Sequence, residues 1–162
     1  MSLISILEAG RRDFLEAVAE VAPDRVALRP QQSRWSVLES IEHVVTVENR
    51  YLEWLEQGQD IGPQRDSEKE LRLFSIMRSR LNKVETPEPM RPQGRYSSLE
   101  ASLTAFQAVR DRSVGIARER GHALYSIGAR HPFFGDVNGV ELMNLIDGHA
   151  RRHADQIRET WP

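Results

Sequence analysis

The sequence predicts an all-α fold, a four-helix bundle with a short crossover helix between its second and third long helices. Apolar residues recur at three- and four-residue steps through four long segments, which is helical spacing. Three of the expected helix starts carry a capping box, a Ser or Asn followed three residues later by Glu. No segment alternates polar and apolar residues over a useful length, so no strands are expected.

The expected elements follow one another without a repeat or a second-domain boundary, which indicates a single domain over residues 1–162. Long helices are expected at 2–19, 36–57, 97–120 and 138–160, and a shorter one at 66–84. The capping boxes pair Ser36 with Glu39, Ser97 with Glu100, and Asn138 with Glu141. Proline and glycine interrupt the chain between these segments, most densely at TPEPMRPQGRY. Four long amphipathic helices of this length are typical of a bundle.

The bulk composition limits the function classes. Hydrophobic residues make up 40% and charged residues 28%, which is typical of a globular domain. The net charge of −2 gives no general electrostatic attraction for nucleic acid. No apolar run approaches the roughly 20 residues that cross a bilayer, and no secretory signal is expected at MSLISILEAG, so neither a membrane partner nor export is expected. Cysteine is absent, which excludes disulfides, thiolate ligands and a cysteine nucleophile and fits a cytoplasmic protein.

Two histidines continue the apolar stripe of the last expected helix. His149 and His153 follow Leu142, Leu145 and Ile146 at helical steps. Residues four apart on a helix are surface neighbours, so both imidazoles can point into the same interior space. Two partly buried histidines that bond to backbone or water would give the same pattern. The spacing is not the zinc-protease motif, because an alanine stands where that motif has glutamate.

His43, two turns inside the second expected helix, is a third candidate, with a solvent-bonded histidine as the alternative. His122 and His131 fall in connectors and are expected to be surface or turn residues. Three further polar residues stand close enough in sequence to the candidate histidines that they could support the ligands, namely Glu42, Asn49 and Asp147. Helix geometry turns the two acidic ones away from the neighbouring histidine by about 100° or more, so they are expected to be surface charges. No general base is assigned.

Two blocks of the chain resemble a known family. Trp35-Ser36-Val37 followed by Glu39, Ile41 and His43 resembles the second-helix motif of the DinB/YfiT-like superfamily, and HPFFGDVNGVEL followed by His149 and His153 resembles its last helix. Ser40 departs from the pattern at an apolar position. The resemblance implies an up-down-down-up bundle with His43, His149 and His153 as ligands of one divalent ion. Three neutral imidazoles suit zinc, nickel, iron or manganese, and leave a coordination position for water or substrate.

The same resemblance implies a reaction class. Characterised relatives resemble metal-dependent transferases or isomerases that use a low-molecular-weight thiol of the bacillithiol, mycothiol or glutathione type, and some resemble hydrolases. Because this chain has no cysteine, the thiol would come from a cofactor whose carboxylates arginines could hold. A non-catalytic, metal- or ligand-binding stress-associated bundle is the alternative. The expected partners are a small-molecule substrate and a second copy of the chain. Trp54 and Trp161 could contribute to such a dimer, or simply cap the bundle.

Overall fold

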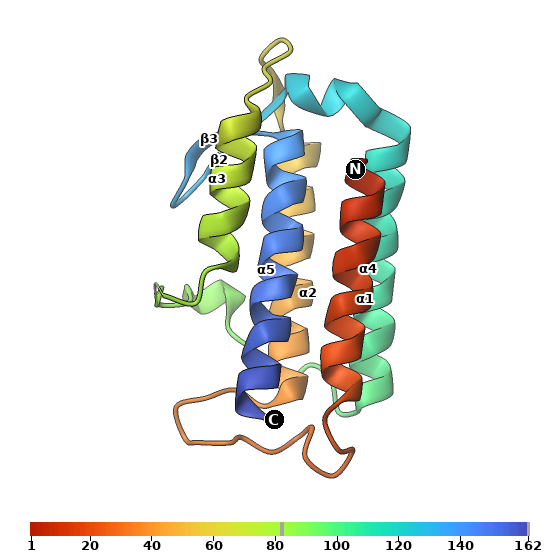
Figure 1. The fold of residues 1–162 in the computed structure, drawn as a ribbon, viewed down its shortest axis with the longest axis vertical. Coiled ribbons are helices and arrows are strands. Elements are labelled where there is room, and N and C mark those ends of the chain that lie inside the picture. Colours follow the sequence, from red (N-terminus) through yellow and green to blue (C-terminus); the bar gives the residue numbers. More distant parts are fainter. Residues whose placement is uncertain (82, 162) are drawn as a thin grey trace.

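The computed structural model describes residues 1–81 and 83–161, and within them five α-helices dominate (Figure 1). The α-helices are α1 Leu3–Ala19, α2 Val37–Glu56, α3 Ser67–Arg78, α4 Leu99–Arg120 and α5 Gly139–Thr160. The strands are β1 Gln59–Asp60, β2 Ile127–His131 and β3 Gly135–Asn138, and two 3-10 helices are η1 Glu88–Met90 and η2 Gly121–Ser126. Residues 82 and 162, which fall within the predicted domain 1–162, lie outside this description.

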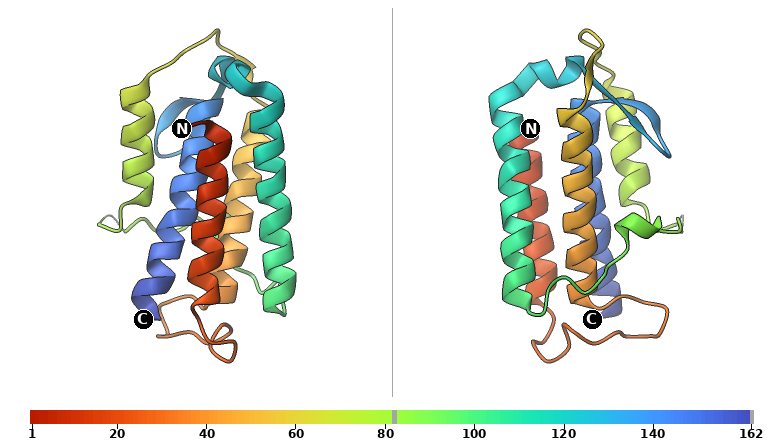
Figure 2. Two further views of the ribbon diagram at one scale, coloured as in Figure 1. Left: turned by 45° about the vertical axis from the view of Figure 1, so that its right-hand side comes forward. Right: turned by 180° about the vertical axis from the view of Figure 1, so that it is seen from behind.

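The four long helices form the bundle. In Figures 1 and 2, α1 and α5 run in one direction, and α2 and α4 run in the other. Helix α1 packs on α4 and α5, and α2 packs on the same two helices from the other side. Helix α3 lies outside the bundle against α5, and the crossover that follows it returns the chain to the start of α4 (Figure 2). None of the described helices is both long and apolar enough to cross a membrane.

Side-chain caps set where the helices begin. The predicted capping boxes at Ser36 and Asn138 are both present, with Glu39 and Glu141 reaching back to the backbone N–H of the capping residue. The third predicted box, which begins at Ser97, is wrong by one residue. Helix α4 is capped by Ser98, whose hydroxyl accepts from the N–H of Ala101 at 3.1 Å.

The shorter helix ends before its predicted boundary. Helix α3 stops at Arg78 rather than at Val84, and residue 82 of the predicted range lies outside the described chain. Leu73 of this helix is buried and Met77 packs against the core, whereas Leu71 is 69% exposed. Helix α3 packs closely against α5 at Gly148, where a Cβ would lie 3.2 Å from the carbonyl oxygen of Phe74.

The expectation of no strands was wrong. Three short strands form an antiparallel sheet in the order β1-β2-β3, with Gln59 opposite Gly128, and His131 opposite Gly135. Each strand has five residues or fewer, which is too short for a period of two to stand out in the sequence. Gly135 closes the β2–β3 hairpin with a φ of 71°, a conformation that glycine adopts without strain.

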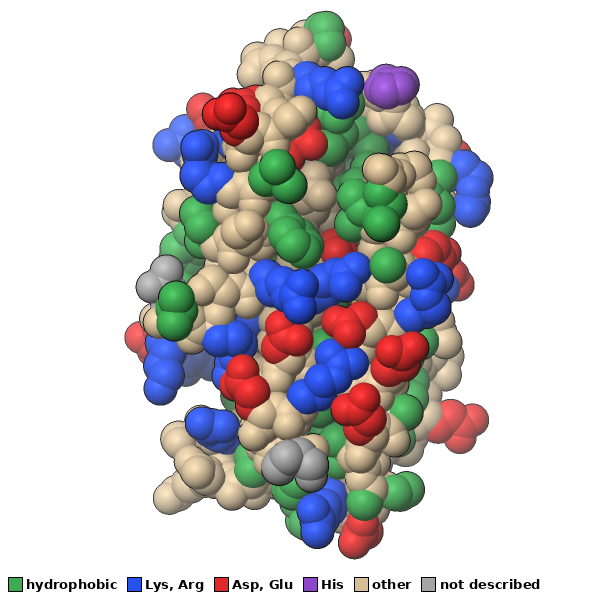
Figure 3. All heavy atoms as spheres, in the orientation of Figure 1, with side chains coloured by type: hydrophobic (Ala, Val, Ile, Leu, Met, Phe, Trp, Pro, Cys, Tyr) green, Lys and Arg blue, Asp and Glu red, His purple; other side chains and the backbone are tan. Residues whose placement is uncertain are grey.

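Ion pairs fasten the outer helices. Figure 3 shows basic and acidic side chains intermingled across the face formed by α1, α3 and α5. Arg158 of α5 bonds to Asp13 of α1 at 2.9 Å, and Arg78 of α3 bonds to Asp155 of α5 at 3.2 Å. These pairs are partly exposed to solvent, and pairs at the surface contribute at most about 1 kcal/mol each, so the bundle depends mainly on its interior.

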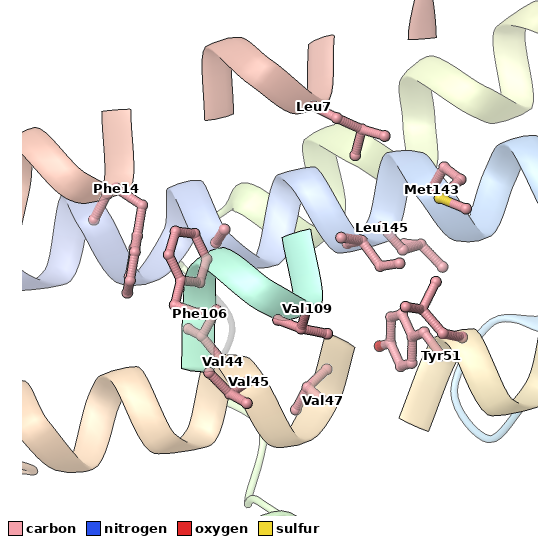
Figure 4. Packing of buried hydrophobic residues seen from close by; sticks show 14 of the residues in the cluster. Leu7, Phe14, Val44, Val45, Val47, Tyr51, Phe106, Val109, Met143 and Leu145 are labelled. Carbon is pink, nitrogen blue, oxygen red and sulfur yellow. The ribbon is translucent and has the colours of Figure 1, made fainter. Parts of the chain in front are cut away.

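The interior is a continuous apolar core contributed by all four long helices (Figure 4). Phe14 of α1 and Phe106 of α4 are fully buried, with ring centroids 4.6 Å apart. The two tryptophans considered for a dimer contact pack at the core's edge. Trp54 stacks on Tyr51 with centroids 5.1 Å apart, and Trp161 lies beneath the guanidinium of Arg25.

A charged cluster crosses this core. Arg110 of α4 has no exposed side-chain surface, and its guanidinium donates to both carboxylate oxygens of Glu48 on α2 at 2.9 and 3.0 Å. The same guanidinium donates to the carbonyl oxygen of Leu7 on α1 and lies 3.7 Å from Asp147 on α5. Ser113 completes the cluster by donating to Glu48 at 2.6 Å. One side chain therefore connects all four long helices.

We predict that Arg110→Met lowers the free energy of unfolding by about 3–5 kcal/mol, because it leaves the buried Glu48 carboxylate without its cation. Urea denaturation measures the change. The matched control is Arg112→Met on the same helix, whose exposed ion pair with Glu56 should contribute less than about 1 kcal/mol. The double variant Arg110→Met, Glu48→Met should recover most of the loss. A single Arg110→Met change as mild as the control would contradict this assignment.

Candidate metal centre

Three buried histidines meet between α2 and α5. The Nε2 atom of His149 lies 3.1 Å from Nε2 of His43 and 3.2 Å from Nε2 of His153. The prospective ligand atoms of the three rings all lie within 4.8 Å of one another. The side chains are at most 8% exposed. The structure therefore brings together the three residues that the sequence singled out, with one helical turn separating the two on α5.

The orientation of the His43 ring is set by a backbone carbonyl. Its Nδ1 lies 2.7 Å from the carbonyl oxygen of Met90 in η1. A carbonyl can only accept, so Nδ1 carries the ring proton and Nε2 presents a lone pair to the other two rings. Trp35 packs beside this group, with its ring centroid 4.8 Å from that of His43 and 6.4 Å from that of His153.

Burial keeps the three imidazoles neutral. It lowers the pKa of His43 to about 4, against the opposing effect of the Met90 carbonyl. The pKa values of His149 and His153 are also well below the ordinary value, mainly through burial and then through the charges of neighbouring histidines and Arg152. Neutral imidazole is the form that coordinates a metal ion.

Hydrogen bonds among the rings cannot account for this arrangement. A neutral imidazole carries one proton, and that of His43 is directed to Met90. A bond between His43 and His149 would therefore need the single proton of His149 on Nε2, where it would also face Nε2 of His153. At metal–nitrogen distances of about 2.0–2.1 Å, ligands at tetrahedral or octahedral angles lie about 2.9–3.4 Å apart. The two Nε2 separations fall in that range, so the donor set fits a first-row divalent ion.

The acidic residues near the centre are buried, contrary to expectation. Glu42 is 2% exposed, because the crossover segment lies over it. Asp147 is fully buried and accepts from Arg151 at 2.8 Å. Burial raises the pKa of Asp147, opposed by Arg151. Asn49 lies away from the centre, within 3.5 Å of Arg112. Glu42 and Asp147 do turn away from the neighbouring histidines, as predicted. Other parts of the chain cover both side chains, so they are not surface charges.

His131 is also buried rather than at the surface, whereas His122 is exposed as expected. The His131 Nδ1 accepts from the N–H groups of Phe133 and Phe134, so its Nε2–H donates to the Tyr51 hydroxyl at 2.7 Å. Burial lowers the pKa of His131 to about 4. This histidine ties the β2–β3 hairpin to α2 and does not belong to the three-histidine group.

A separate cavity of about 1020 Å³ lies between the sheet and the start of α3. Its described lining includes Trp54, Lys69 and Glu141 but none of the three clustered histidines. Lys69 is already engaged there, donating to Glu141 at 2.8 Å and to the carbonyl oxygen of Asp136 at 2.9 Å. The cavity offers no group comparable to the histidine cluster.

Fold and site together define the class of four-helix bundles with an internal three-histidine centre. The chain belongs to the DinB superfamily, whose family model matches residues 6–157. This match confirms the resemblance seen in the sequence.

Two similar proteins come from Bacillus subtilis. The uncharacterized protein YuaE of strain 168 is 18% identical over 156 residues, which cover 96% of this chain and 95% of that protein. The solved structure of YfiT has a TM-score of 0.61 at 16% identity, with 98% of this chain and 83% of that chain covered. YfiT is described as a probable metal-dependent hydrolase with an unusual four-helix bundle topology. At this identity the likeness shows a shared fold.

We predict that the chelator-treated protein loses stability as the pH falls from about 6.5 to about 4. In this window the unfolded histidines are protonated while buried His43 and His131 stay neutral, so the unfolded state binds more protons. Each such histidine contributes a slope of up to about 1.4 kcal/mol per pH unit. Urea denaturation at several pH values measures how the free energy of unfolding depends on pH. In His131→Gln this dependence should be weaker, by the equivalent of about one bound proton. An unchanged slope in this variant would contradict the burial of a neutral His131.

Proposed function

We propose that this protein is a divalent-metal-dependent enzyme, built on an up-down-down-up bundle, in which His43, His149 and His153 hold one ion. The observation that supports this most directly is the convergence of three buried, neutral imidazoles with short Nε2–Nε2 separations. Zinc, nickel, iron and manganese are all compatible with such ligands. When bound, the ion supplies a Lewis acid that lowers the pKa of a water or thiol ligand.

The surrounding residues fit this role. The Met90 carbonyl holds the His43 proton on Nδ1, and Trp35 shields one side of the rings. The group includes no carboxylate among the described residues, so three neutral ligands would leave the double charge of the ion intact. A stronger residual charge makes a better Lewis acid, and a three-ligand set leaves room for an exchangeable ligand.

Hydrolysis is the first candidate reaction. The YfiT structure, which shares this fold, is described as that of a probable metal-dependent hydrolase. A three-histidine centre is one of the arrangements that activate water in known zinc enzymes. The substrate would be a small molecule with an electrophilic carbon or phosphorus.

Transfer of a low-molecular-weight thiol of the bacillithiol, mycothiol or glutathione type is the second candidate. Arg152 and Arg80 are close enough to the centre for their charges to lower the pKa of His153, and Arg152 also lowers that of His149. Guanidinium groups near the centre suit a carboxylate-bearing thiol, and Arg80 already pairs with the Glu159 carboxylate at 3.1 Å. The absence of cysteine requires that any such sulfur be brought by a small molecule. A non-catalytic bundle remains the contrasting proposal. In it, a bound ion would have no coordination position open to water or substrate.

The test compares metal-loaded and chelated protein on two substrate panels. One panel contains activated esters in water, and the other contains a model electrophile with each cellular thiol. We expect activity on one panel, lost on chelation and reduced at least about 100-fold in His149→Ala, since loss of a ligand exceeds the effect of losing a supporting residue. The matched control, His122→Ala, removes an exposed histidine and should retain full activity.

Arg152→Gln distinguishes the two candidates. For thiol transfer, the KM for a carboxylate-bearing thiol should rise about tenfold or more while the KM for its methyl ester changes little. For ester hydrolysis, Arg152→Gln should leave both kcat and KM nearly unchanged. Activity that survives chelation would contradict the proposal, and metal binding without activity on either panel would favour the non-catalytic bundle.

A further inference from the structure

The crossover strap, defined here as residues 88–95, runs beside the histidine centre. It begins with η1, whose last residue Met90 accepts from His43, and it reaches α2 a second time three residues later (Figure 2). Both contacts on α2 come from neighbouring residues, His43 and Glu42. The strap is therefore fixed to α2 at two adjacent positions.

The second contact is a backbone anion site. The Glu42 carboxylate accepts from the N–H groups of Gln93 at 2.7 Å, and of Gly94 and Arg95 at 3.0 Å each. Three consecutive N–H groups can converge on one anion because Gly94 has a φ of 73°. The carboxylate is 2% exposed, so these bonds replace its lost hydration.

The segment between the two contacts is short and stiff. Only Arg91 and Pro92 separate Met90 from Gln93, and proline fixes one of the intervening φ angles. Pro87 and Pro89 restrain the preceding turn in the same way. The Arg91 guanidinium donates to the Thr86 carbonyl at 2.9 Å and pairs with Glu85. Few free torsions separate Gln93 from Met90, so we expect a displacement at Gln93 to move the Met90 carbonyl as well.

We infer that Glu42 is a positioning residue for the histidine centre, acting through the crossover strap. Its carboxylate holds residues 93–95, which places the Met90 carbonyl against Nδ1 of His43, and that bond directs the Nε2 lone pair toward His149 and His153. Hydrogen-bonded partners of ligating histidines fix the tautomer and the ring orientation. This inference rests on the proposed metal site, and it adds a residue that touches neither the ion nor the substrate.

The test uses the 162-residue chain and its variant Glu42→Gln. The amide keeps the side-chain size, but it replaces one acceptor oxygen with an NH₂ group that faces backbone donors. Zinc affinity is measured by competition with a chromophoric chelator, and the His43 tautomer by long-range ¹H–¹⁵N NMR of the metal-free protein. We expect zinc to bind about 10–100-fold more weakly. The wild type should show the Nδ1–H tautomer, and the variant a mixture.

Two further variants separate positioning from general destabilisation. Leu55→Ala, a buried site twelve residues after His43 on the same helix and so about 18 Å further along its axis, lowers stability and should keep zinc affinity within about twofold. Gly94→Ala strains the anion site from the strap side and should weaken zinc binding as Glu42→Gln does. It also serves if Glu42→Gln does not fold.

Unchanged zinc affinity and an unchanged His43 tautomer in Glu42→Gln and Gly94→Ala would overturn the inference, as would an equal affinity loss in Leu55→Ala. A wild-type protein that binds no zinc, cobalt or nickel would instead refute the proposed metal site. The tautomer measurement is made without metal, so it would still decide whether Glu42 sets the His43 ring.

Discussion

The buried guanidinium of Arg110 constrains the position of every long helix. It bonds to Glu48 on α2 and to the Leu7 carbonyl on α1, and it lies beside Asp147 on α5. Removing these charges from water costs several kcal/mol per ion, which the contacts largely offset, so the cluster is better understood as fixing helix register than as adding stability. Gly10 is part of the same arrangement, because a Cβ there would lie 1.7 Å from Asp147 Oδ1.

This register matters for the histidine centre because the cluster and the centre share two helices. Glu48 lies five residues after His43 on α2, and Asp147 lies two residues before His149 on α5. The contacts of Arg110 therefore fix how α2 and α5, which carry the three imidazoles, are positioned along each other's axes. Burial keeps the rings neutral, and the crossover strap selects the lone pair of His43. The chemistry proposed for the centre follows from these three constraints acting together.

The sequence predicted the features that depend on neighbouring residues, such as helix starts and helix faces. Helical periodicity and the capping box at Asn138 located α5, and the phase of that helix placed His149 and His153 on its inner face. The features that were missed depend on distant partners. Glu42 is buried because residues 93–95 fold over it, and His131 because its hairpin packs on Tyr51. Arg110 carried no signal at all, since an arginine among alternating charges on a helix reads as a surface residue.

Anomalous diffraction from crystals grown with cobalt or zinc tests the central claim most directly. We expect one ion per chain, about 2.0–2.1 Å from the Nε2 atoms of His43, His149 and His153, with at least one further ligand that is not protein. An ion bound elsewhere, or a fully loaded protein in which the three imidazoles do not ligate it, would contradict the account.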